Sequence, residues 1–76
     1  MGSKMSLQNR LREIRTQRGL TQEALARAVG VTRQTIIAVE QSKFVPSVKL
    51  ALELSAALET PLDQVFWLER KEGARS

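Results

Sequence analysis

The stretch Thr21–Glu40 reads TQEALARAVGVTRQTIIAVE, and it decides the fold of this chain. Thr21 and Thr32 each precede a segment with apolar residues at helical spacing, and a threonine hydroxyl there caps a helix by accepting a backbone N–H. Gly30 lies between the two segments and permits a sharp reversal, because glycine adopts the left-handed backbone at little cost. The stretch therefore predicts two short helices, over about 22–29 and 33–41, joined by a tight turn.

The helix predicted over 33–41 has two different faces. Ile36 and Val39 fall on one side and are expected to point into the core. The other side carries Gln, Arg and small apolar residues, a combination that suits base edges and thymine methyls in the DNA major groove. We expect base contacts from Arg33, Gln34, Thr35, Ile37 and Ala38.

Alternatives stay open for two of these residues. Arg33 could bond guanine, bond only a phosphate, or remain a solvated charge. Ile37 could contact a thymine methyl or be an ordinary exposed isoleucine, which is common on protein surfaces. Arg10, Arg12, Arg18 and Arg27 are interpreted as solvated side chains that attract DNA at long range.

Helical spacing continues on both sides of this stretch. Leu7, Leu11 and Ile14 recur at i, i+4 and i+7 and predict a first helix that ends at Gly19. Further helices are predicted from about 47 to 58 and from about 60 onward, and no alternation typical of a strand precedes residue 64. The predicted fold class is all-α, a compact five-helix bundle.

The run Phe66-Trp67-Leu68 places three large apolar residues directly before a polar segment. Phe66 is expected in the core, whereas Trp67 and Leu68 are expected at a dimer interface, extended as a short strand that pairs across a two-fold axis. The alternative is that Trp67 folds over Leu62 or Leu52 of its own chain.

Seventy-six residues are enough for one domain. We expect that domain to span 7–68, with an N-terminal tail over 1–6 and a polar C-terminal tail over 69–76. Met1-Gly2-Ser3 is interpreted as a remnant of cloning, with the native start at Met5. The alternative is a myristoylation signal, because the first six residues also fit that pattern.

The composition argues against several classes of protein. The chain has no cysteine, no histidine and a single aspartate, so thiolate zinc sites and the usual general bases are almost absent. We expect no enzymatic activity, no cofactor and no metal. No apolar run approaches the roughly 20 residues of a membrane span. The lack of cysteine fits a reducing compartment, and a cytoplasmic location is expected.

The charge is distributed unevenly. The net charge is +4, but residues 1–45 carry eight basic against three acidic side chains, whereas residues 46–76 carry four against five. A basic half is typical of a domain that binds a polyanion. The half that contains the predicted base-contacting helix is therefore also the half that would attract DNA.

These features together resemble one known family. The text LREIRTQRGLTQEALA over 11–26, GVTRQTI over 30–36, AVE over 38–40 and PS over 46–47 is similar to the lambda-repressor/Cro-like helix-turn-helix family, also called the xenobiotic-response-element (XRE) type. The resemblance covers about residues 7–66. It implies a five-helix bundle whose third helix enters the major groove, and members that usually bind as dimers.

The resemblance also implies roles for single residues. Gln22, Thr32, Ser42 and Lys43 would contact phosphates, and Arg15 with Glu40 would form a partly buried salt bridge between the first and third helices. The chain departs from the common pattern in two places. Ile37 stands where relatives often have Asn, which removes a polar donor, and Gln41-Ser42 replaces Asn-Gly, which alters the turn.

Two functions from different classes follow. The first is a sequence-specific transcriptional regulator, expected to be a repressor, that binds double-stranded DNA at a palindromic operator as a homodimer. The second is an antitoxin or another protein-interaction module with the same fold. In that case Ile37, Trp67 and the apolar side of the fourth helix would contact a protein partner.

Overall fold

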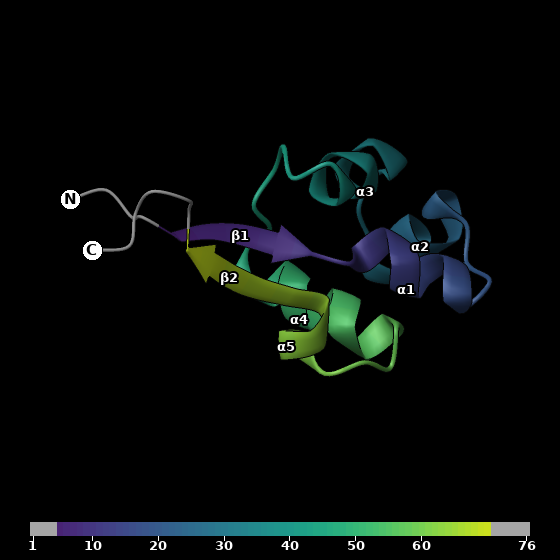
Figure 1. The fold of residues 1–76 in the computed structure, drawn as a ribbon. Coiled ribbons are helices and arrows are strands. Elements are labelled where there is room, and N and C mark those ends of the chain that lie inside the picture. The colour runs from purple at the N-terminus through teal and green to yellow at the C-terminus, as the bar shows by residue number, and fades with distance from the viewer. Residues whose placement is uncertain (1–4, 71–76) are drawn as a thin grey trace.

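The computed structural model describes residues 5–70 of the chain. Five helices form a compact cluster, and a two-stranded sheet projects from one end of it (Figure 1). In chain order the elements are β1 Met5–Asn9, α1 Leu11–Gln17, α2 Gln22–Val29, α3 Arg33–Glu40, α4 Val48–Ala57, α5 Leu62–Val65 and β2 Phe66–Arg70. The predictions for residues 1–4 and 71–76 lie outside the described residues.

Hydroxyl caps begin three of the helices, as the sequence predicts for Thr21 and Thr32. Thr21 accepts the backbone N–H of Ala24 at 2.9 Å, and Thr32 accepts that of Thr35 at 3.2 Å. Ser47 caps α4 in the same way. Each cap satisfies a backbone donor that has no partner within the helix, and this defines where each helix begins.

The first four helices all end in the same backbone motif. A left-handed residue follows within two positions of each helix end, and the next N–H reaches back to a carbonyl five positions earlier, which is a Schellman ending. The left-handed residues are Gly19, Gly30, Ser42 and Glu59, with φ of 71°, 75°, 61° and 53°. Ser42 and Glu59 therefore hold a conformation that costs a residue with a Cβ more than it costs glycine.

The first strand corrects the prediction for the N-terminus. Leu7 was expected on the first helix, but it lies in β1, which pairs antiparallel with β2 in the register Leu7↔Leu68 and Asn9↔Phe66. Helix α1 begins only at Leu11. The prediction was wrong because the spacing of Leu7 and Leu11 fits a helix, whereas the partner of the strand lies about 60 residues away and leaves no local pattern.

The sheet also changes the expected ends of the domain. Met5 and Ser6, predicted as tail, lie in β1, and Glu69 and Arg70 lie in β2. Trp67 and Leu68 are extended, as predicted, but their strand pairs with β1 of the same chain. The five predicted helices are confirmed, and the two-stranded sheet is added to them.

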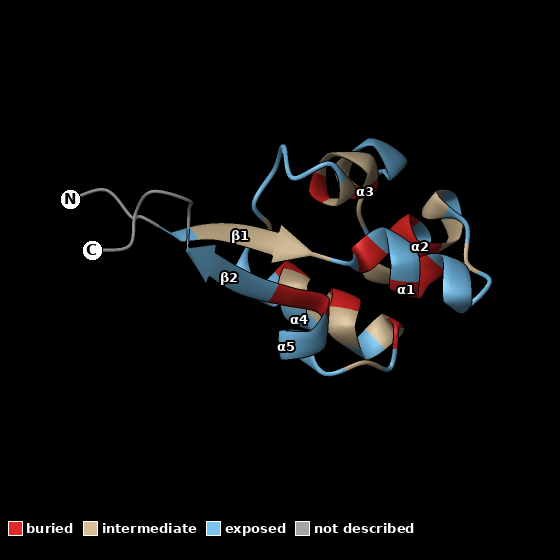
Figure 2. Cartoon of the chain, in the orientation of Figure 1, coloured by how far each residue is buried: buried red, intermediate tan, exposed pale blue. Residues whose placement is uncertain are grey.

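The core lies between the helices and the base of the sheet. Figure 2 shows the buried segments of the helices facing inward and the start of β2 buried against them. The fully buried side chains are Leu11, Leu25, Ile36, Val39, Leu54, Leu58 and Val65. Phe66 is buried as predicted. Within residues 5–70, no helix has the length and apolar character needed to cross a bilayer.

Candidate nucleic-acid interface

Helix α3 presents the two faces that its sequence predicts. Ile36 and Val39 are buried in the core, whereas Arg33 and Gln34 are exposed at the start of the helix. Ile37 and Ala38, one turn later, are partly buried. Arg33 and Gln34, which can each donate several hydrogen bonds, are therefore open to solvent on a well-packed helix.

Thr32 and Thr35 form a small hydroxyl pair at the N-terminus of α3. Their Oγ1 atoms lie 3.0 Å apart, and either can be the donor. A hydroxyl has a single proton, so one of the two protons is used between them and the other stays available to an outside acceptor. The pair can thus offer one donor beside the positive end of the helix.

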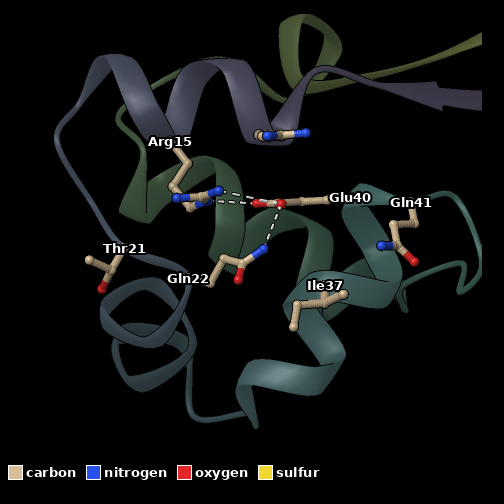
Figure 3. A pocket seen from close by; sticks show the side chains of 7 residues that line it. Arg15, Thr21, Gln22, Ile37, Glu40 and Gln41 are labelled. Atoms are coloured by element: carbon tan, nitrogen blue, oxygen red, sulfur yellow. Dashed lines mark hydrogen bonds and ion pairs between the residues drawn. The ribbon is translucent and has the colours of Figure 1, made fainter.

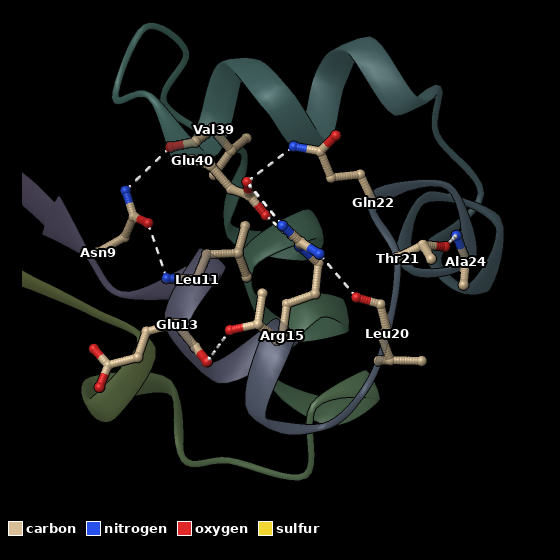
Figure 4. A network of polar contacts seen from close by, with 11 residues as sticks. Asn9, Leu11, Glu13, Arg15, Leu20, Thr21, Gln22, Ala24, Val39 and Glu40 are labelled. Carbon is tan, nitrogen blue, oxygen red and sulfur yellow. Dashed lines mark hydrogen bonds and ion pairs between the residues drawn. The ribbon is translucent and has the colours of Figure 1, made fainter.

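Arg15 and Glu40 meet as an ion pair between α1 and α3 (Figure 4). Arg15 Nε lies 2.6 Å from Glu40 Oε2, and Nη2 donates to Oε1 at 3.4 Å. The third arm of the guanidinium donates to the carbonyl of Leu20 at 2.8 Å. The two side chains are 9% and 4% exposed, so this pair is buried and satisfied by several hydrogen bonds.

Gln22 extends the cluster to the first residue of α2. Its Nε2 donates to Glu40 Oε1 at 3.1 Å (Figure 3). An amide nitrogen carries two protons, so one remains for an outside acceptor while the other holds the side chain in place. The residue expected to contact phosphate is thus oriented by the buried ion pair.

A polar hollow of about 500 Å³ lies between α1, α2 and α3. Its lining includes Gln22, Ile37 and Gln41, and it also includes Arg12 from α1. Arg12 is exposed, in line with its interpretation as a solvated residue, and it stands three positions before Arg15, so it also borders the hollow from the same side of α1. That spacing was the signal in the sequence that could have identified it.

Ser42 and Lys43 lie in the turn that follows α3. Lys43 is exposed, and its backbone N–H donates to the carbonyl of Ala38 at 2.8 Å, which fixes the turn. Asn9, which no sequence pattern singled out, reaches this turn from the end of β1. Its Nδ2 lies 3.1 Å from the carbonyl oxygen of Val39 and 3.5 Å from Ser42 Oγ.

The sheet and α4 form an apolar groove on another part of the molecule. Its volume is about 570 Å³, and its lining includes Leu7, Val45, Val48, Leu62, Phe66 and Leu68. Leu68 is 59% exposed, and Val48 is 74% exposed. Trp67 lines the same groove, and the guanidinium of Arg10 lies 5.3 Å from the centre of its ring. A solvent-exposed apolar surface of this kind is typical of a site that a binding partner covers.

Among residues 5–70, no cluster of His, Cys, Asp and Glu side chains has the arrangement of a metal site. The features that stand out are thus the exposed start of α3, the polar hollow beside it and the apolar groove.

Comparison with known proteins identifies this arrangement of helices as a helix-turn-helix domain. A family model described as helix-turn-helix matches residues 11–65. The HTH-type transcriptional regulator YgzD of Bacillus subtilis is 43% identical over 65 residues, which is 86% of this chain and 98% of that protein. An HTH-type transcriptional regulator of Methanothermobacter thermautotrophicus is 47% identical over 66 residues, 86% of this chain and 94% of that one.

A solved structure is also similar. The restriction-modification controller protein C.AhdI from Aeromonas hydrophila superposes with a TM-score of 0.69 at 38% identity, covering 72% of this chain and 80% of that chain. The chain belongs to the helix-turn-helix family, in its lambda-repressor and Cro-like form.

Proposed function

We propose that this protein is a transcriptional repressor that binds a palindromic DNA operator as a homodimer. One observation carries the proposal: α3 holds Arg33 and Gln34 exposed at its start, next to a polar hollow that contains Gln22 and Arg12. A helix with base-reading side chains, flanked by groups that bind phosphate, is the arrangement needed for reading the major groove.

In this proposal α3 lies in the major groove. Gln34 pairs with adenine, and Arg33 pairs with guanine or a neighbouring phosphate. Thr35, Ile37 and Ala38 complete the face, with Ile37 and Ala38 supplying apolar contact for thymine methyls. Ile37 and Ala38 are partly buried, so each still presents some apolar surface to the groove.

Phosphate contacts lie on both sides of α3. On one side are Gln22 and Arg12, close to the N-terminus of α2, where the helix dipole favours an anion. On the other side are Ser42 and Lys43. Thr32 adds the hydroxyl proton that its pair with Thr35 leaves available. Contacts on both sides would fix the register of α3 along the groove.

Dimerisation is supported by the apolar groove and the exposed side chain of Leu68. A two-fold interface uses the same surface on both subunits, so the two copies of α3 would meet two half-sites of an inverted repeat. Such a dimer excludes other proteins from a promoter by occupying it, so repression needs no further surface.

Selection of bound duplexes from a random DNA pool at near-physiological salt tests this proposal. We expect enrichment of an inverted repeat whose half-sites lie about 10 base pairs apart, one turn of the helix. A pool that stays random while the protein still binds at low salt would contradict sequence-specific recognition.

The same groove favours a second candidate, a protein-interaction module such as an antitoxin. In this alternative Trp67 and the exposed side of α4 contact a different protein, and DNA binding can persist beside it. Sedimentation of the purified protein distinguishes the two. A homodimer at micromolar concentration supports self-association, whereas a monomer with an open groove supports a different partner.

A further inference from the structure

We propose that Asn9 is a positioning residue for base recognition: it ties the last turn of the recognition helix α3 to the sheet. The inference rests on the proposed function and adds a residue that touches no DNA in it. Asn9 lies at the end of β1, 30 positions before the carbonyl that it reaches in α3.

The amide of Asn9 joins two elements with its two ends. Its Oδ1 accepts the backbone N–H of Leu11 at 2.9 Å, two positions along the chain, and so forms an Asx-turn that leads into α1. Its Nδ2 donates to the carbonyl of Val39 at 3.1 Å (Figure 4). Ser42 Oγ lies 3.5 Å from the same nitrogen. One partly buried side chain thus fixes the start of α1 and the end of α3 together.

The backbone that carries Asn9 is itself held firmly. Asn9 pairs with Phe66 in the sheet, and the next N–H, that of Arg10, donates to the carbonyl of Val65 at 3.0 Å. Phe66 and Val65 are buried in the core. The side chain of Asn9 is therefore attached to a well-fixed backbone, and this allows its hydrogen bond to restrict the motion of α3.

The tether acts beside the buried ion pair. Asn9 binds the backbone of Val39, and Arg15 binds the side chain of Glu40, the next residue. One anchor comes from α1 and the other from the last residue of β1, and both hold the last turn of α3. With one anchor, α3 could still rotate about that single point of attachment, whereas two adjacent anchors restrict this rotation. The orientation of α3 in turn sets where Arg33 and Gln34 meet the bases.

Loss of the tether should therefore affect specific binding more than general attraction to DNA. Base contacts require a defined helix orientation, whereas attraction to phosphates tolerates small rotations. If α3 samples other orientations, only the molecules with the correct orientation bind the operator well, and the apparent affinity falls in proportion to their fraction. The net value of one hydrogen bond limits this loss to about two- to tenfold.

The Asn9→Ser variant separates the two roles of the side chain. Serine can form the same turn with the N–H of Leu11, although more weakly, but it is too short to reach the carbonyl of Val39. The matched control is Ser47→Ala, which removes a cap from α4 and leaves α3 untouched. Both variants should unfold at lower urea concentration than the parent protein, so stability alone does not distinguish them.

Affinities for the selected operator and for a scrambled duplex test the inference, measured without denaturant over the same series of salt concentrations for each variant. We expect Asn9→Ser to lose about two- to tenfold in operator affinity, with scrambled-duplex affinity and salt dependence unchanged, and Ser47→Ala to keep the parent ratio. An unchanged ratio for Asn9→Ser, or equal loss on both duplexes, would overturn it. A parent protein that prefers no sequence would instead refute the proposed function.

Discussion

Arg15 and Glu40 form a bidentate ion pair with an Nε–Oε2 distance of 2.6 Å, and both side chains are almost completely buried. The pair joins α1 to α3 and also holds Gln22, the first residue of α2 (Figure 3). Three elements of the candidate DNA-binding surface thus share one buried charged cluster. Its geometry leads directly to the first prediction.

Removing the charge of one partner of this ion pair should strongly destabilise the folded protein. The Glu40→Gln variant leaves the guanidinium of Arg15 buried without its counter-charge, which should cost about 3–5 kcal/mol of the free energy of unfolding. Much of the stability of so small a domain would be lost, and the helical circular dichroism signal in a urea titration would show it. Glu23→Gln is the matched control, because Glu23 pairs with Arg27 on the surface and is 71% exposed. It should change stability by less than about 0.5 kcal/mol.

The left-handed residues after the helices predict opposite effects at two positions. Gly30→Ala should destabilise the protein by about 1 kcal/mol, because φ is positive there, although no atom lies within 4 Å of the new Cβ. Glu59→Gly should stabilise it by about 0.5–1 kcal/mol, because it relieves the same strain after α4. Urea midpoints measure both. A stabilising Gly30→Ala change would show that backbone strain does not govern these turns.

Two variants should separate base reading from phosphate binding. Gln34→Ala should cost about 1–3 kcal/mol on the selected operator and relax the preference at one base position. Lys43→Ala should weaken binding to operator and scrambled DNA alike and reduce the slope of affinity against salt by about one. Competition binding at several salt concentrations gives both quantities. Equal losses on both duplexes for Gln34→Ala would assign Gln34 to the backbone instead.

The proposed dimer predicts a contrast between neighbours on β2. Leu68 lines the apolar groove, whereas Glu69, the next residue of the strand, does not line it. Leu68→Gln should raise the dimer dissociation constant by about tenfold or more, since it removes an apolar side chain that the proposed dimer would bury. Glu69→Gln should leave the constant unchanged. A dilution series by analytical ultracentrifugation measures it, with Trp67→Ala as a second test of the interface.

If Leu68→Gln and Trp67→Ala both remain as dimeric as the parent protein, self-association uses another surface. The apolar groove would then be free for a different protein, as in the second candidate function.

The sequence by itself determined the helical part of this protein. Thr21 and Thr32 start helices because the capping bond forms between residues three positions apart, and Gly30 ends one because its backbone freedom is intrinsic to it. The inward side of α3 follows from helical periodicity alone. These are short-range effects, so the order of residues along the chain contains them.

The tertiary structure decided the contacts that join distant segments. Leu7 lies in a strand because β2 is available about 60 residues later, and the pairing energy exceeds the local preference for a helix. Asn9 reaches Val39, and Arg12 reaches the hollow beside Gln22, only after α1 has packed against α3. Local spacing does not encode such contacts, because their stabilisation appears only when the segments are brought together by the core.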